Sequence, residues 1–263
     1  MIFNSLKNSA LKIIFSPWTL LIFATVSLFG LLMGNIVGWA VEKPVIDLIL
    51  YYDALAQSNF LFILLTQYPL ELFTIIVSGI VGLVISATGL LSLARIAKGE
   101  SIVDAINESV LNWKKSLGLA VFFVAAIIVL VGIFFVLSAI TGLLSGVIPD
   151  SSYLFDGIIF PLVFFIILLF AMVKLGFVIP AFVENDLRKA VQKSWEFTNK
   201  RFLGAFLLMI ILIVIIFAFE IVGQNISLMI DPQYELVVTS VADIISTTFI
   251  GLALAYYYFA KKS

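Results

Sequence analysis

Six long apolar runs constrain this chain more than any other feature of its sequence. Each reaches the roughly 20 apolar residues that a helix needs to cross a bilayer core of about 30 Å. The runs cover residues 17–41, 69–97, 117–144, 157–183, 202–228 and 237–260. Backbone groups in lipid find no water, so each run must satisfy its own hydrogen bonds as a helix. The runs are continuously apolar and lack the polar alternation of barrel strands.

The composition agrees with a membrane protein. Hydrophobic residues make up 63% of the chain and charged residues 12%, against about 45–50% and about 25% in soluble domains. The absence of cysteine and histidine removes thiolate metal ligands, cysteine nucleophiles and the commonest general base. A net charge of −1 gives no broad basic face for nucleic acid. We therefore expect a single transmembrane domain over residues 1–263, with no cofactor, no metal and no intrinsic catalysis.

The basic residues predict the orientation. Thirteen of the fifteen Lys and Arg residues fall on one side of the six runs, and that side is expected to be cytoplasmic. Only Lys43 lies on the other side, and Lys174 lies within a run. The sequence thus predicts a multi-pass protein of the plasma membrane with both termini in the cytoplasm.

Three segments that precede the first, third and fifth runs resemble one another. They cover residues 3–16, 101–115 and 186–201 and have the apolar spacing of amphipathic helices that lie on a membrane surface. In the last two, Ser101 aligns with Asp186 as a helix N-cap, and Ser109 aligns with Ser194. The expected fold is all-α, with six transmembrane helices, three cytoplasmic interfacial helices and a pseudo-repeat of helix hairpins. The repeat units cover about 3–97, 101–183 and 186–260.

Basic side chains of these segments are candidate contacts for anionic lipid, because each contributes about 1 kcal/mol near an anionic leaflet. Simple orientation and surface anchoring would also explain them. The candidates are Lys114, Lys115, Arg188, Lys189, Lys193, Lys200 and Arg201.

The run GFVIPAFVENDLRKAVQKSWEFTNKRFLGAF resembles a group of six-helix membrane proteins that includes the membrane domain of some glycerophosphoryl diester phosphodiesterases. The resemblance rests on Pro180, Glu184, Ala190, Ser194 and Trp195, followed by a basic pair. The runs SLKNSALKIIFSPW and ARIAKGESIVDAINES are also similar to that group. The hydrolase chemistry of the group belongs to a separate soluble domain, so the resemblance implies no catalytic residue here. It implies at most an association with membrane lipid.

Three charged side chains inside the runs are candidates for a polar site in the membrane. Glu220 and Asp243 lie at similar heights on neighbouring antiparallel runs, where two carboxylates can bind a cation or share a proton. The alternative is that both acids meet water at the outer headgroups. Lys174 lies about 12 Å from the inner end of its run. It can pair with a carboxylate or an anionic headgroup, or it can snorkel to the interface.

Small residues spaced four apart give several runs a face for close helix packing. Packing within the chain is one explanation, and a homo-oligomer formed through the first run is the other. The residues are Gly30, Gly34, Gly38, Ser78, Gly82, Ser86 and Gly251.

Two functions remain open from the sequence. One is transport or lipid handling, with the polar groups around Glu220, Asp243 and Lys174 along a path. The other is a non-catalytic membrane subunit or scaffold that binds a partner membrane protein through the small-residue faces and the apolar segment 44–66. Membrane lipids are expected partners in both, and nucleic acid in neither.

Overall fold

The structure is a computed structural model that describes residues 1–50, 68–147, 155–229 and 235–260. Within these ranges the chain is helical and has no strand. Six stretches of helix are long and apolar enough to cross a membrane, which is compatible with a multi-pass membrane protein. They belong to α2 (Trp18–Leu50), α5 (Pro69–Lys98), α7 (Trp113–Val147), α9 (Phe160–Leu175) with α10 (Val178–Glu184), α12 (Phe202–Met229) and α13 (Glu235–Phe259).

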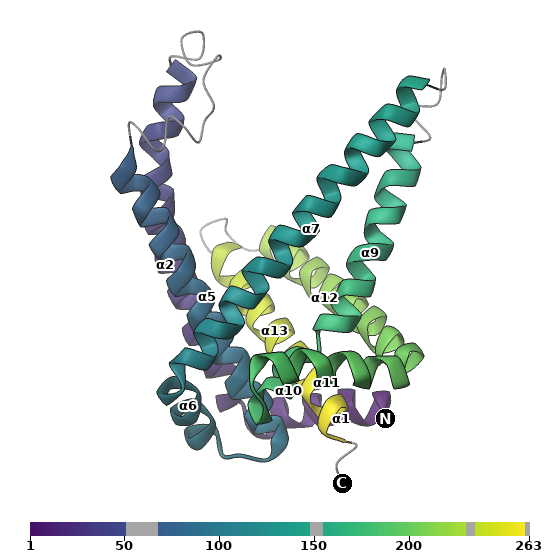
Figure 1. Cartoon of the computed structure of the whole chain (residues 1–263). Helices are drawn as coiled ribbons and strands as arrows, with labels where there is room; N and C mark the ends of the chain where they lie inside the picture. The colour runs from purple at the N-terminus through teal and green to yellow at the C-terminus, as the bar shows by residue number, and fades with distance from the viewer. Residues whose placement is uncertain (51–67, 148–154, 230–234, 261–263) are drawn as a thin grey trace.

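Three further helices lie at the same end of the molecule as α10, where the N-terminus also lies (Figure 1). They are α1 (Ile2–Phe15), α6 (Ile102–Leu111) and α11 (Leu187–Lys200). We call α1, α6 and α11 the short-helix layer. Each packs on a spanning segment. The helix α6 packs on α5 and α11 packs on α10, in both cases the segment just before it in the chain, whereas α1 packs on α13.

Each helix of the short-helix layer packs through two small residues four apart. Residues at this spacing lie on one helical face, and small side chains let two helices approach closely. All six of these residues are buried. The pairs are Ser5 with Ser9, Ala105 with Ser109, and Ala190 with Ser194.

The core lies at the same end of the bundle as the short-helix layer. Its buried side chains come from the last turns of α5 and α13, the first turns of α7 and α12, and the α9–α10 segment. Leu119, Phe177 and Leu208 are fully enclosed there. The helices are thus held together mainly at one end.

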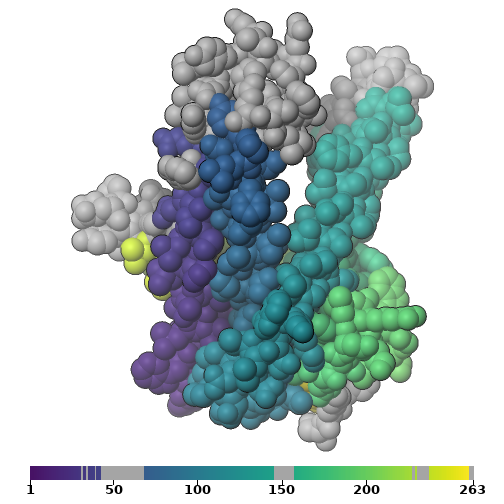
Figure 2. Space-filling view, turned by 60° about the vertical axis from the view of Figure 1, so that its left-hand side comes forward, coloured from purple at the N-terminus to yellow at the C-terminus, as the bar shows by residue number. Residues whose placement is uncertain are grey.

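The hairpins α2–α5 and α7–α9 diverge away from this core (Figures 1 and 2). Large apolar side chains on their diverging parts are exposed, among them Leu28, Ile128 and Phe135. In water such exposure would be costly, whereas lipid tails are as apolar as these side chains.

The structure differs from the expected bounds in the first and third spans. The helix α2 continues past Pro44 to Leu50, into the segment 44–66, whose residues from 51 onwards lie outside the described residues. The helix α6 ends at Leu111, because Asn112 leaves the helical region at φ −93° and ψ 36°. Lys114 and Lys115 therefore belong to the first turn of α7 and not to the end of α6.

Of the residues expected to pack helices, Gly251 lies at a close approach within the chain. A Cβ at Gly251 would come within 2.7 Å of Cδ1 of Leu93 on α5. Ser78 is buried and Ser86 is half-buried on α5. A Cβ at Gly30, Gly38 or Gly82 would meet no atom within 4 Å, and the surroundings of Gly34 lie outside the described structure.

Candidate functional site

A break in the fourth span places Lys174. The sequence predicted one helix here, but α9 ends at Leu175 and α10 begins at Val178. Proline has no N–H and its ring clashes with the carbonyl four residues earlier, so Pro180 disfavours a regular helix at Gly176. Carbonyls in the last turn of a helix lack an intrahelical donor. The Ser194 hydroxyl donates to the Lys174 carbonyl at 2.6 Å, which fastens α11 to the end of α9.

Aromatic rings surround the Lys174 ammonium. Its Nζ lies 4.5 Å from the ring centroid of Trp195, 5.5 Å from that of Phe170 and 5.8 Å from that of Phe202. Nζ also donates a hydrogen bond to Oδ1 of Asn199. The Lys174 side chain is buried, with 4% of the residue exposed. Its ammonium therefore lies between the end of α9 and α11, against Asn199 and Trp195.

Lys174 and Trp195 line one end of an apolar pocket between α7 and α9. We call this the Lys174 pocket, and its volume is about 530 Å³. Its other walls are aliphatic and aromatic side chains of the two helices, among them Phe122, Val129 and Ile167. Lys174 is the one charged residue among those that line it. The pocket thus combines a long apolar wall with a single cation.

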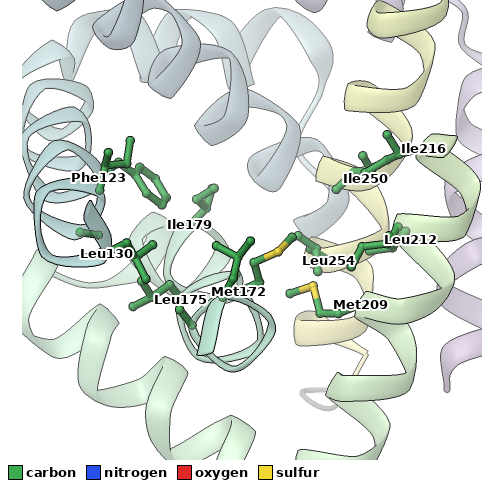
Figure 3. Close-up of a pocket in the computed structure, with 16 residues that line it drawn as sticks. Phe123, Leu130, Met172, Leu175, Ile179, Met209, Leu212, Ile216, Ile250 and Leu254 are labelled. Carbon is green, nitrogen blue, oxygen red and sulfur yellow. The ribbon is translucent and has the colours of Figure 1, made fainter. Parts of the chain in front are cut away.

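A second pocket lies on the other side of the contact between α7 and α9. Figure 3 shows Phe123 and Leu130 on one side of it and Leu212 and Ile250 on the other. This interior pocket has a volume of about 270 Å³ and is lined by apolar residues of α7, α9, α10, α12 and α13, together with Gly176. It shares with the Lys174 pocket a wall that consists of Ala126, Leu130, Ala171 and Leu175.

The first hairpin carries a comparable pocket without a charge. It lies between α2, α5 and α6, is closed by Trp113 and has a volume of about 390 Å³. Its lining residues include Thr25, Thr88 and Ser92, and no charged residue is among them. We call it the uncharged pocket.

The structure brings Glu220 and Asp243 together at a different place. Both line a small pocket of about 160 Å³ between α12 and α13, with Gln224 and Thr239. Both acids are exposed. This pocket shares no lining residue with the Lys174 pocket. The three charged candidates of the sequence therefore belong to two separate sites.

The basic candidates lie at the short-helix end. Lys114 and Lys115 begin α7, four others lie on α11, and Arg201 follows α11 directly. Five of the seven are exposed, and Lys115 and Arg201 are half-buried. The two half-buried cations lie over aromatic rings, Lys115 over Phe182 at 5.6 Å and Arg201 over Phe197 at 5.9 Å.

Sequence reasoning missed the partners of Lys174. Trp195, Asn199 and Phe202 lie 21 to 28 residues further along the chain, and only the fold of α11 under the bundle brings them to Nζ. The available signal was Pro180, which indicates a break at the residue four positions earlier.

Within the described ranges, no group of three or more Asp and Glu residues is placed to hold a metal ion. No family model, curated protein or solved structure matches this chain. The resemblance to phosphodiesterase membrane domains therefore stays a prediction, and the site must be interpreted from its own geometry.

Replacement of Ser194 tests the contact that fastens α11 to α9. Ser194→Ala should lower the free energy of unfolding by about 1 kcal/mol, because the buried Lys174 carbonyl then loses its hydrogen-bond donor. The measurement is thermal unfolding in detergent, followed by circular dichroism. Ser109→Ala is the matched control, since the Ser109 hydroxyl donates to Ala105 within its own helix. Equal effects of the two replacements would contradict the role of Ser194.

A disulfide tests the placement of Glu220 beside Asp243. A Cβ at Gly223 would lie 3.1 Å from Cβ of Ala242, a few tenths of an ångström below the usual disulfide range of about 3.5–4.5 Å. The natural chain has no cysteine, so the pair Gly223→Cys and Ala242→Cys should oxidise without competing thiols. The measurement is the mass added by a maleimide reagent: the oxidised pair should no longer react, because neither thiol is free. The pair Gly30→Cys and Ala242→Cys should stay reduced, and oxidation of both pairs alike would refute the placement.

Proposed function

We propose that this protein binds and handles membrane lipids without intrinsic catalysis. The observation that carries the proposal is the pair of apolar pockets on the two sides of the α7–α9 contact, with volumes of about 270 and 530 Å³. Binding sites for small molecules commonly occupy about 300–1,000 Å³ and are mainly apolar with few polar groups. An apolar pocket that is open along two membrane-spanning helices suits an acyl chain better than a hydrated solute.

The separation of the two polar sites favours lipid handling over a continuous solute path. A path through the bundle would need polar groups at successive depths. Instead, the pocket of Glu220 and Asp243 and the Lys174 pocket share no residue, and the interior pocket is lined by apolar side chains and one glycine. Transport of an ion or a polar solute through these groups is therefore the weaker form of the proposal.

The fold supports a threefold pseudo-repeat as part of the proposal. Each unit begins with a helix of the short-helix layer that buries two small residues four apart, and each such helix packs on the last span of another unit. Exposed apolar side chains on these helices, among them Phe3, Val103 and Trp195, suit helices that lie in the membrane interface. The basic residues at the same end favour a cytoplasmic position in a plasma membrane.

A scaffold or subunit role is the second candidate. The observation that favours it is the open face of α2, where a Cβ at Gly30 or Gly38 would meet no atom within 4 Å. Small residues let another helix approach closely, from a second copy or from a partner membrane protein.

Cysteine labelling tests the orientation. Single cysteines at Ser58 and Ser263 of this cysteine-free chain should react from opposite sides of the membrane. A membrane-impermeant maleimide should label Ser58→Cys in intact cells and Ser263→Cys only after permeabilisation, because the basic side faces the cytoplasm. The reverse pattern would contradict the orientation.

Native mass spectrometry of gently extracted protein tests lipid binding. The chain should retain phospholipid at a defined stoichiometry, and Ala126→Trp should remove it, because residue 126 lies in the wall shared by both pockets. Ile128→Trp is the matched control on the same helix, since Ile128 is 65% exposed and lies outside the lining of both pockets.

A chain that retains no lipid would refute the proposal. Additional protein chains at fixed stoichiometry, with no bound lipid, would favour the scaffold role. Loss of lipid in both tryptophan variants would show that the α7–α9 pockets are not the binding site.

A further inference from the structure

The positive charge of Lys174 lacks a negative partner in the part of the chain that the structure describes. The ion pairs there join Arg95 to Glu100 and Glu108, and Lys98 to Glu184. The partners of Lys174 are a neutral amide oxygen on Asn199 and the faces of aromatic rings. An ammonium removed from water is costly unless an anion compensates it, and ring faces compensate only part of that cost.

The position of the charge suits the headgroup of a lipid. Lys174 lies at the end of the pocket where α11 crosses beneath α9, and the rest of the pocket wall is apolar. An amphiphile has the same division, with one charged group and a long apolar chain. Asn199, which holds Nζ, is exposed on α11, so an anion can reach the ammonium by displacing one amide side chain.

We propose that the Lys174 pocket selects an anionic phospholipid, with a phosphate oxygen paired to the Lys174 ammonium and an acyl chain between α7 and α9. This inference rests on the proposed lipid-binding function and adds the chemical class of the ligand. The phosphate oxygen replaces Asn199 as the principal acceptor of Nζ. Trp195 covers the ammonium at 4.5 Å and limits access of water to the ion pair.

The uncharged pocket of the first hairpin serves as a comparison, because selection of a lipid by its headgroup charge is expected only in the Lys174 pocket. Both pockets lie between the two helices of a hairpin and a helix of the short-helix layer, and each includes a tryptophan. Of the two, only the Lys174 pocket is lined by a cation. The uncharged pocket can hold an acyl chain, but nothing in its lining discriminates between headgroups by charge.

Exposed lysines on α11 attract anionic lipids without selecting a site. Lys193 is exposed on α11, and its effect operates through the charge of a lipid surface. A micelle of neutral detergent has no such surface charge. Lys193→Met in neutral detergent is therefore the matched control for Lys174→Met, because each replacement removes one positive charge from the same end of the protein.

The experiment compares phosphatidylglycerol with phosphatidylcholine that has identical acyl chains. Each lipid is titrated into the delipidated full-length chain in neutral detergent, and bound lipid is counted by native mass spectrometry. The wild-type chain should prefer phosphatidylglycerol by roughly tenfold, because the choline cation of phosphatidylcholine repels the Lys174 ammonium and offsets the phosphate charge, whereas the glycerol of phosphatidylglycerol is neutral. Lys174→Met should bring this preference to within about twofold of unity, whereas Lys174→Arg and Lys193→Met should each retain it.

Equal binding of the two lipids by the wild-type chain would overturn the inference. So would an equal loss of preference in Lys174→Met and Lys193→Met. In a third titration under the same conditions, tighter binding of oleate than of phosphatidylglycerol would also overturn it. In each of these cases lipid is still retained, and the proposed lipid-binding function survives. Retention of neither phospholipid would instead refute that function itself. Folding of Lys174→Met is checked by the retention of phosphatidylcholine.

Discussion

Backbone hydrogen bonding in a medium without water is the constraint on which this structure depends. It makes every span helical, and it makes a broken span costly unless another group replaces the missing bond. Where α9 ends, that group is the hydroxyl of Ser194, which reaches the Lys174 carbonyl at 2.6 Å. The same contact holds α11 beneath α9, so Trp195 and Asn199 lie beside the Lys174 ammonium. The lysine site thus follows from the repair of a helix break.

The sequence was informative where a local pattern decides the structure. Apolar length predicted six spans, and Ser101 was predicted as an N-cap, where its side chain does accept a hydrogen bond from the Asp104 N–H. Their distance from the ends of the apolar runs also identified Glu220, Asp243 and Lys174 as charged residues within expected membrane spans. The rest depends on contacts between distant segments. Neither periodicity nor composition shows that Phe202 lies near Lys174, or that a lysine pair follows a short break at Asn112 and so begins a new helix.

Charge and packing divide the molecule into two zones. Its tightly packed zone contains the core and the lysine pocket, and small side chains let the short helices approach the spans there. Towards the other end the hairpins diverge and expose apolar side chains. Lipid is the medium that such surfaces require. Any ligand that enters between α7 and α9 therefore meets a fixed charged end and an open apolar end, which orients an amphiphile before any specific contact forms.

The packing of α1 on α13 sets an order for biosynthesis. The helix α1 leaves the ribosome before α13, on which it packs, and the other described helices are synthesised between the two. At about 5–20 residues per second, the intervening residues take roughly 10–50 s to synthesise. During that interval α1 lacks its contact with α13, although α2 is already present. This contact can close only after α13 has been synthesised, so a chain interrupted before α13 would leave α1 without the helix on which it packs.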